Sequence, residues 1–297
     1  MQHVNVLLST YNGKRYMREL IDSIIAQEGV SADILARDDG STDGDTQRIL
    51  DDYQQRGLLT WYQGENLRPA HSFMQLLADA HEAPFYAFAD EDDYWQPDKL
   101  ATAVKALEPY AGKPALYFSR TQLTDENLNP ISGPVINPLL TFGESLVYKF
   151  IPGCTMVFNK ELRDIVNTFR ADFVPMHDIW IYSIALAVKA KVVFDPQPHI
   201  LYRQHGDNTI GQGQGQMHEW HRRLKRLNSH ERYRQACELL RGYAPFMGSD
   251  ELDTLSTFVN ARRSLTARLR LIGDKRFVCA DSRTYRLFQL AVLLNIY

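Results

Sequence analysis

A run of four acidic residues, Asp90-Glu91-Asp92-Asp93, directly follows a short apolar segment at 85–89. Four adjacent carboxylates repel one another, and a divalent cation relieves that repulsion. Magnesium in proteins is usually held by one or two carboxylates and completes its coordination with water and substrate phosphates. An Asp-X-Asp at the mouth of a strand therefore predicts a site for a metal ion and a diphosphate. For the motif in isolation, an acidic surface turn is the more common explanation.

A second polar cluster combines the loop STYN at 9–12 with Asp39 further along the chain. A loop with an aromatic ring and small polar groups can stack on a nucleobase and hydrogen-bond a ribose. A neighbouring carboxylate can accept a hydrogen bond from the N3–H of uracil or thymine. The segment 38–43 also has the composition of a turn followed by a helix N-cap. Both uses are compatible, with Asp39 facing a ligand.

Two further candidates lie in the second half of the chain. Asp178 follows His177 at the start of an expected helix, where a carboxylate interacts favourably with the helix N-terminus. The same carboxylate can act as a general base toward an incoming hydroxyl. Arg203 and His205 follow an expected strand, and they can bind phosphate oxygens or a metal, or simply form a surface pair.

The elements that must position these side chains alternate between strand and helix in the first half. Short apolar runs predict strands at 4–8, 34–36, 59–62 and 85–89, with helical spacing of apolar residues between them. This alternation indicates an α/β fold, in which helices cover both faces of a mostly parallel sheet. Ligands bind such sheets outside the carboxyl ends of the strands, so the two acidic clusters are expected to converge there.

The second half is less regular. A Gly-rich polar segment at 206–216 is expected to be a lid or linker, and the part beyond it is expected to be helical. A well-buried helix is expected at 177–189. Short strands are expected at 115–118, 155–158, 192–194 and 200–202.

Composition bounds the class of protein. The chain has 297 residues, of which 44% are apolar, enough for one catalytic domain of about 200 residues plus an appendage. Its three cysteines are widely spaced, which argues against a disulfide framework or a thiolate zinc site and favours a reducing cytoplasm. The N-terminus lacks a signal-peptide pattern, and no stretch approaches the ~20 apolar residues of a membrane span.

The net charge of −3 hides an asymmetry. From His218 to the last residue the chain has 15 Lys and Arg against 8 Asp and Glu, so the remainder is strongly acidic. A basic segment that ends in the apolar run 287–296 predicts contact with an anionic membrane surface, although a solvated helical surface has the same composition. No nucleic-acid partner is predicted.

Taken in order, seven segments resemble the family 2 inverting glycosyltransferases, which have a GT-A fold. The resemblance is collinear from Val4 to Gly211, and the ordered set is far more specific than any segment alone. The nearest subgroup in pattern is the bacterial rhamnosyltransferases of surface-polysaccharide assembly, whose acidic motif commonly reads DQDDVW. The segments are LLSTYNGKRYMRELIDSIIAQ, ARDDGSTDGDT, GENLRPAHSF, FADEDDYWQPDKL, PGCTMVFNKEL, HDIWIYSIAL and YRQHGDNTIG.

The resemblance implies a role for each matching position. Asp178 would be the catalytic base, and Asp92 and His205 would hold Mg²⁺ or Mn²⁺. The acceptor side would include Asp93, Trp95 and His177. The nucleotide-sugar would be bound by Thr10, Tyr11, Asn12, Asp39, Asn66, Asp90 and Arg203.

Two positions depart from the family pattern. Glu91 replaces the usual Gln in the acidic motif and adds a charge next to the metal site. Arg68 stands where an NLG sequence would place a glycine, so the loop after Asn66 is expected to differ.

The implied activity is metal-dependent, inverting transfer of a sugar to a hydroxyl of a surface-polysaccharide or lipid-linked glycan. L-Rhamnose from dTDP-rhamnose is the preferred donor, and a UDP-hexose or UDP-N-acetylhexosamine is the alternative. A nucleotidyltransferase would be expected to carry a Gly-rich basic phosphate loop where this chain has STYNGK. A degenerate sugar-binding module would not need the full set of carboxylates.

The implied organisation has three parts. Residues 1–211 form the GT-A catalytic domain, with the nucleotide-sugar bound by about 1–110 and the acceptor by 111–211. Residues 212–217 form a linker or lid, and 218–297 form a basic helical extension. The expected location is the cytoplasm, peripherally on the cytoplasmic face of the inner membrane.

Overall fold

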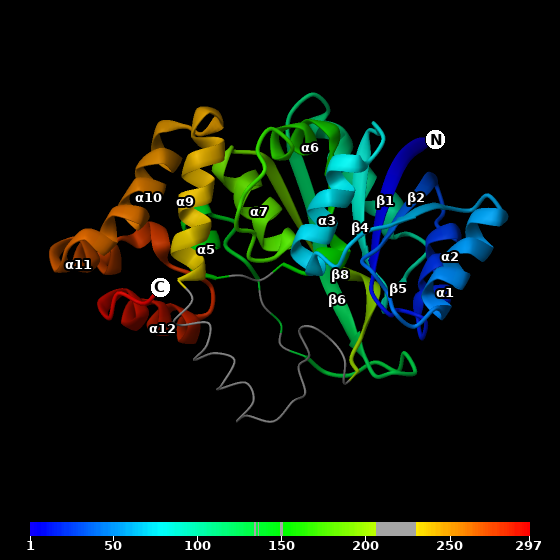
Figure 1. Ribbon diagram of the computed structural model, residues 1–297. Helices are drawn as coiled ribbons and strands as arrows, with labels where there is room; N and C mark the ends of the chain where they lie inside the picture. The colour runs from blue at the N-terminus through cyan, green and yellow to red at the C-terminus, as the bar shows by residue number, and fades with distance from the viewer. Residues whose placement is uncertain (134, 136, 149–150, 206–229) are drawn as a thin grey trace.

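A mixed eight-stranded sheet forms the centre of the computed structural model, which describes residues 1–133, 135, 137–148, 151–205 and 230–297 (Figure 1). The strand order is β3-β2-β1-β4-β7-β6-β8-β5. The strands are β1 (Gln2–Thr10), β2 (Val30–Asp38), β3 (Thr60–Gln63), β4 (Phe85–Asp90), β5 (Tyr94–Trp95), β6 (Ala115–Thr124), β7 (Val157–Asn159) and β8 (Lys191–Arg203).

The pairing of these strands confirms the predicted fold class. The four strands β3, β2, β1 and β4 run parallel, as do β6 and β8. The short strands β7 and β5 run antiparallel to their neighbours. The parallel register places Thr10 opposite Asp38 and Ser9 opposite Asp90, so both acidic clusters begin at the same edge of the sheet.

Helices cover both faces of the sheet, because the strands are apolar on both sides. In β1, Val4, Val6 and Leu8 face one hydrophobic core, whereas Leu7 faces the other. The first core is closed by α1 (Met17–Ile25), α2 (Asp45–Gln55) and α4 (Lys99–Leu107). The second is closed by α3 (Arg68–Asp79), α5 (Phe142–Val147), α6 (Lys160–Val166) and α7 (His177–Ala187).

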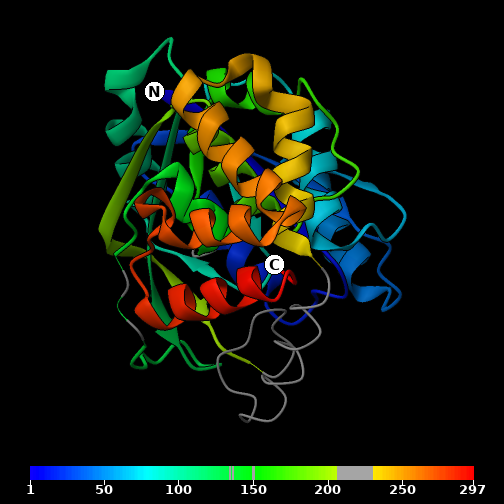
Figure 2. The same ribbon diagram turned by 90° about the vertical axis from the view of Figure 1, so that its left-hand side faces the viewer.

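The C-terminal helices extend the second core. They pack against α5 and α7, with Tyr243, Phe258 and Tyr297 almost fully buried (Figure 2). The Tyr243 hydroxyl donates to the carbonyl of Val166, 2.8 Å away, and so ties the extension to α6. These helices are α9 (Glu231–Tyr243), α10 (Ser249–Asn260), α11 (Leu265–Gly273) and α12 (Ser282–Leu293).

The local expectations were met unevenly. The strands expected at 192–194 and 200–202 form one continuous strand, β8, whose pairing with β6 shifts register near Pro196 and Pro198. Proline lacks the N–H of a ladder hydrogen bond, which explains the irregularity. The linker expected at 212–217 lies outside the described residues, and the domain boundaries stay a prediction. No described helix is long and apolar enough to cross a membrane.

Candidate active site

A cleft of about 790 Å³ opens at the carboxyl ends of β1, β2 and β4 and is closed on another side by the first turn of α7. Ten of the thirteen side chains predicted for the site line it. The other three, Asp93, Trp95 and Arg203, do not, and each is at most 2% exposed. The ten are Thr10, Tyr11, Asn12, Asp39, Asn66, Asp90, Asp92, His177, Asp178 and His205.

The loop after β1 is held in place from both sides. Asn12 has a left-handed backbone, with φ of 56°, which its short polar side chain tolerates. Its Oδ1 accepts from the backbone N–H of Thr42 at 2.9 Å, so the Asn12 side chain braces the neighbouring loop. Tyr11 is 46% exposed in the cleft wall, and its backbone N–H donates to Glu91 at 2.8 Å. The tyrosine ring is thus presented to the cleft on a fixed backbone.

Asp39 is buried in the cleft floor and accepts several hydrogen bonds. Its Oδ1 accepts from the guanidinium of Arg37 and from the N–H of Leu67 at 2.9 Å. Its Oδ2 accepts from the N–H of Arg68 at 2.9 Å. A carboxylate has about four acceptor sites, so three contacts leave room for one further donor, such as a nucleobase N–H.

Arg37 is a structural residue that the motifs did not single out. It is 2% exposed, and besides Asp39 it donates to Ser72 Oγ at 2.9 Å and to the carbonyl of Glu65 at 2.8 Å. The available signal was a single cation inside the apolar strand ILARD. An arginine on a buried strand needs a partner, and Asp39, two residues further on, supplies it.

Arg68, which stands where the family pattern has a glycine, adopts the backbone conformation that glycine favours. Arg68 has a φ of 64°, in the left-handed region that glycine favours. A glycine at this position in related sequences would adopt that backbone without strain, whereas arginine does so at a cost of roughly 1 kcal/mol. The backbone N–H that results points at Asp39, and the Arg68 side chain lines the cleft.

The acidic loop after β4 is crowded with like charges. Burial, followed by the charges of Asp92 and Asp178, raises the pKa of Asp90 well above its usual value. Burial is also the main cause that raises the pKa of Glu91 to about 8. Glu91 points at the loop after β1 and braces it, so the departure from the family pattern adds a structural contact as well as a charge.

Asp92 and His205 meet at the mouth of the cleft. His205 Nε2 lies 2.9 Å from Asp92 Oδ2, and the imidazole ring stands 5.1 Å from the ring of Tyr16. A carboxylate oxygen and an imidazole nitrogen in contact can bind one divalent cation together. The carboxylates near this pair have few positive charges to balance them, so the pair fits the expected metal.

Arg203 lies beneath the cleft and does not line it. Its guanidinium pairs with Glu19 at 2.6 Å, donates to the carbonyl of Asp92 at 3.1 Å and lies 4.2 Å from the centre of the Tyr16 ring. With these contacts and only 2% exposure, the side chain supports the Asp92 loop from below. Its expected contact with the diphosphate stays a prediction.

Asp93 and Trp95 also lie beneath the cleft, and their expected contact with the acceptor stays a prediction. Asp93 is fully buried, with ligand atoms of Asp90 and Cys154 within 4.8 Å. Trp95 stacks under the Lys99 ammonium, 3.4 Å from the ring centre. Burial lowers the pKa of Lys99 to about 7. A thiol and a nearby ammonium make this cluster a poor site for a hard cation.

Asp178 and His177 stand on the other wall of the cleft, at the start of α7. Asp178 is 7% exposed, and its Oδ1 accepts from the backbone N–H of Ile179 at 2.6 Å. Burial lowers the pKa of His177 to about 3, so the imidazole is neutral, and it stacks on Phe73 with ring centres 3.9 Å apart. A Cβ on Gly153 would lie 2.8 Å from His177 Nε2, which explains a glycine there.

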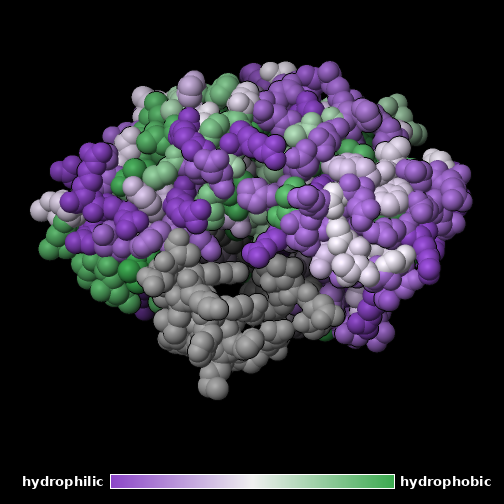
Figure 3. Space-filling view, viewed as in Figure 1, coloured by the Kyte–Doolittle hydropathy of each residue, from purple (hydrophilic) through white to green (hydrophobic). Residues whose placement is uncertain are grey.

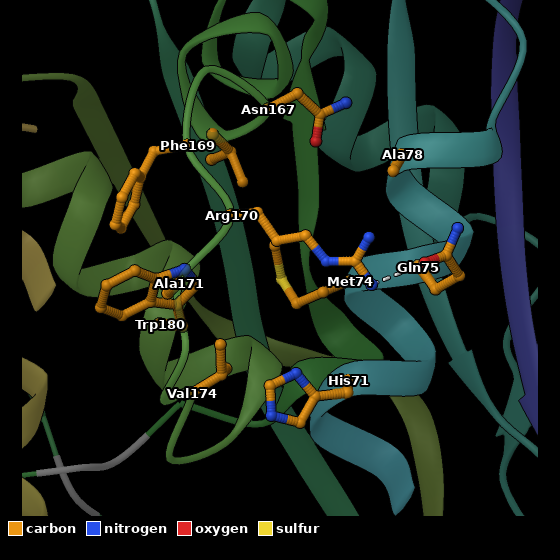
Figure 4. Close-up of a pocket in the computed structure, with 11 residues that line it drawn as sticks. His71, Met74, Gln75, Ala78, Asn167, Phe169, Arg170, Ala171, Val174 and Trp180 are labelled. Atoms are coloured by element: carbon orange, nitrogen blue, oxygen red, sulfur yellow. Dashed lines mark hydrogen bonds between the residues drawn. The ribbon is translucent and has the colours of Figure 1, made fainter. Parts of the chain in front are cut away.

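A second, smaller cavity of about 240 Å³ lies between α3, α7 and the segment after α6 (Figure 4). Arg170 reaches across it to Gln75, with Nη2 3.3 Å from Oε1. The remaining labelled side chains include His71, Met74 and Trp180. None of the thirteen predicted site residues lines this cavity, so the candidate chemistry belongs to the larger cleft.

Solved structures with a similar arrangement have the GT-A fold. A fragment of S. aureus TarS in complex with UDP-GlcNAc matches with a TM-score of 0.57 and 14% identity, covering 100% of this chain and 90% of that one. The mannosyltransferase PcManGT from Pyrobaculum calidifontis, in complex with GDP-Man and Mn²⁺, matches with a TM-score of 0.55 and 18% identity, covering 98% and 86%. The chain thus has the GT-A fold.

The family follows from the sequence. The model of glycosyl transferase family 2 matches residues 5–166, and the chain belongs to this family. The dTDP-rhamnosyl transferase RfbG of Shigella flexneri is 28% identical over 227 residues, which cover 69% of this chain and 73% of that protein. An uncharacterised glycosyltransferase of Rickettsia typhi is 24% identical over 240 residues, covering 77% and 73%.

Proposed function

We propose that this protein is a metal-dependent, inverting glycosyltransferase that moves L-rhamnose from dTDP-rhamnose to a hydroxyl of a surface-polysaccharide or lipid-linked glycan. The observation that carries the proposal is one cleft with two separate acidic walls. The Asp92–His205 pair stands on one wall and Asp178 on the other. The first suits a cation and a diphosphate, and the second suits a proton acceptor.

The nucleoside end of the donor would lie over Asp39 and Tyr11. The exposed ring of Tyr11 offers a stacking surface for the base, and the remaining acceptor site of Asp39 suits a pyrimidine N3–H. Uracil and thymine both have this N–H. The rhamnosyl donor is therefore favoured by the relative in Shigella flexneri and not by a contact in the cleft.

Asp92 and His205 would hold Mg²⁺ or Mn²⁺, and the cation would neutralise charge on the departing nucleoside diphosphate. Asp178 would take the proton of the acceptor hydroxyl as its oxygen attacks the anomeric carbon. The bond from that carbon to the diphosphate oxygen breaks on the opposite face, so the configuration inverts. Arg203 and Glu91 would keep the acidic loop and the base-binding loop in position throughout.

A UDP-hexose or UDP-N-acetylhexosamine donor is the second candidate. It is favoured by the fold shared with TarS, which was solved with UDP-GlcNAc. A lipid-linked acceptor would also place the protein peripherally on the cytoplasmic face of a membrane, as expected from its basic C-terminal part. A degenerate nucleotide-binding module is the lower alternative.

The test is the variant Asp178→Asn, measured in two ways. Calorimetry with dTDP-rhamnose and MnCl₂ should give a Kd within about threefold of wild type. Transfer to a panel of octyl glycosides should fall roughly 10²- to 10⁴-fold, the usual contribution of a general base. The matched control is Asp172→Asn, an exposed carboxylate shortly before α7, which should retain full turnover. Unchanged turnover in Asp178→Asn would remove it as the base.

A further inference from the structure

The outer sides of α11 and α12 carry six exposed leucines that do not pack into the hydrophobic core. These six residues, named at the end of this paragraph, are called the α11–α12 apolar face. Leu287 and Leu290 of α12 and its C-cap residue Leu294 follow each other at helical spacing and form one stripe. The opposite side of the same helix is buried, with Phe288 and Val292 at 1% exposure or less. The six residues, each 44–57% exposed, are Leu265, Leu269, Leu287, Leu290, Leu293 and Leu294.

The space-filling view shows where these side chains gather. An apolar area covers α11 and α12 at the lower left of Figure 3, whereas the neighbouring surface is largely hydrophilic. Single exposed leucines are ordinary on a protein surface, but a contiguous group framed by polar residues marks an interaction site. The packing of α12 on the body therefore accounts for only half of its apolar residues.

The surroundings of this face are basic. Residues 261–297 contain eight Lys and Arg but only two Asp. One arginine, Arg276, is paired with Asp253 and Asp274. In contrast, the exposed Arg263, Arg270, Arg283 and Arg286 make no ion pair with any residue of the described part of the chain. The face thus offers unpaired positive charge beside apolar side chains.

We infer that the α11–α12 apolar face binds the surface of an anionic lipid bilayer. Apolar side chains that enter the headgroup region, flanked by arginines that attract anionic lipids, are the features that hold a helix in the membrane interface. A second copy of the chain fits the same face poorly, because symmetric contact would bring two sets of unpaired arginines together.

Binding in this way would bring the cleft toward the bilayer. In Figures 1 and 2, α12 lies in the lower part of the molecule. In Figure 1, β1 runs downward from the N-terminus, and β4 is parallel to it, so their carboxyl ends lie toward the same side. Only the idea that the acceptor lies in the membrane depends on the proposed function. The bilayer contact itself involves residues outside the cleft and needs no donor.

Co-sedimentation with vesicles tests the inference on the full chain without nucleotide or metal. The probe is vesicles of phosphatidylethanolamine and phosphatidylglycerol, compared with vesicles of phosphatidylcholine alone. Wild type should bind the anionic vesicles at least about tenfold more tightly. Arg283→Gln/Arg286→Gln should weaken binding about tenfold or more, since each basic residue near an anionic surface contributes roughly fivefold. Leu287→Gln/Leu290→Gln/Leu294→Gln should weaken it at least as much.

The control variant is Ile25→Gln/Arg48→Gln, an exposed apolar and an exposed basic residue on α1 and α2, and it should bind like wild type. Thermal unfolding of every variant verifies that the fold is intact, and glutamine keeps the helix propensity high. Equal binding by wild type and the leucine variant would overturn the inference. So would a wild-type dimer that the leucine variant dissociates in sedimentation velocity. If the protein binds anionic vesicles but shows no transferase activity, the proposed function fails and the membrane inference stands.

Discussion

The two acidic clusters of the cleft hold their charges in opposite ways. Asp39 is paired with a buried guanidinium and two backbone N–H groups, so its charge is balanced within the protein. In the loop after β4, burial and neighbouring carboxylates raise the pKa of Asp90 and Asp93 well above the usual range. Aspartate thus forms a charge-balanced pair with Arg37 at position 39, whereas the aspartates at 90 and 93 lie among other carboxylates without enough positive charge to balance them. Only the second is improved by a cation.

The largest expected effect on stability comes from breaking the buried Arg37–Asp39 ion pair. Arg37→Met leaves the buried Asp39 carboxylate without its cation and should lower the free energy of unfolding by about 3–5 kcal/mol. The loss should be the same with and without Mn²⁺, as followed by urea denaturation. Arg48→Met, on an 82% exposed arginine with one surface ion pair, is the control and should change stability by less than about 1 kcal/mol.

The double variant Arg37→Met/Asp39→Leu sharpens this prediction. Removing both charges should recover much of the stability, because no buried charge is left unpaired. If Arg37→Met alone unfolds like wild type, Asp39 is not held by this pair and the contrast between the clusters fails.

The acidic loop should respond in the opposite way to loss of a carboxylate. Asp92→Asn should leave the metal-free protein at least as stable as wild type, since it removes one of several like charges. It should also abolish stabilisation by nucleoside diphosphate with Mn²⁺, which amounts to about 2.7 kcal/mol when ligand is at about 100 times its Kd. Calorimetric melting with Mn²⁺ or EDTA measures both. A loss of stability in EDTA would contradict the account.

His177 is a third kind of buried polar group, whose ring nitrogens have no hydrogen-bond partner among the described residues. Its pKa is lowered to about 3, whereas in the unfolded chain it is near 6.5. The unfolded state therefore gains a proton as the pH falls below 6.5, and the native state does not. Wild type should lose about 2 kcal/mol from this group between pH 8 and pH 5.

His177→Phe removes that loss while keeping the stack on Phe73. The difference in unfolding free energy between variant and wild type should grow by about 2 kcal/mol in favour of the variant over the same pH interval. A constant difference would mean that His177 is protonated in the folded protein.

The smallest expected effect belongs to Glu91. Its pKa is raised to about 8, so ionisation destabilises the folded protein as the pH rises through that value. Glu91→Gln keeps an acceptor for the Tyr11 N–H and removes the charge. In EDTA the variant should be at least about 1 kcal/mol more stable at pH 9, and the gain should shrink at pH 5. An equal gain in stability at pH 9 and pH 5 would mean that the gain comes from packing and not from removal of the charge.

The parallel half of the fold was predictable because its elements are strictly periodic. The apolar strands β2 and β4 both run parallel to β1, which lies between them. Their carboxyl ends therefore place Asp39 and Asp90 at one edge of the sheet. The ordered motifs identified the family, since each segment constrains a different part of the same cleft. Cleft-lining positions such as Asp178 were accordingly found without a structure.

What the sequence could not supply was side-chain direction. Arg203 and Asp93 stand in motifs next to cleft residues, but alternation along the chain turns them beneath the cleft. Besides the nearby Asp39, Arg37 binds Glu65 and Ser72, which are about 30 residues away along the chain, so no local pattern indicates these two partners. Likewise, helical spacing could not tell which apolar residues of α12 are buried, because both faces of this helix are apolar.

The most direct test of the central claim is a thermal-shift panel with dTDP, UDP, GDP and their sugars, each in Mn²⁺, Mg²⁺ or EDTA. The account predicts that dTDP-rhamnose raises the melting temperature with metal, that EDTA removes the effect, and that Asp92→Asn never gains it. Stabilisation by UDP-sugars under the same metal dependence would keep the mechanism and change the donor. No response to any nucleotide, or an equal response in EDTA, would contradict a metal-dependent glycosyltransferase.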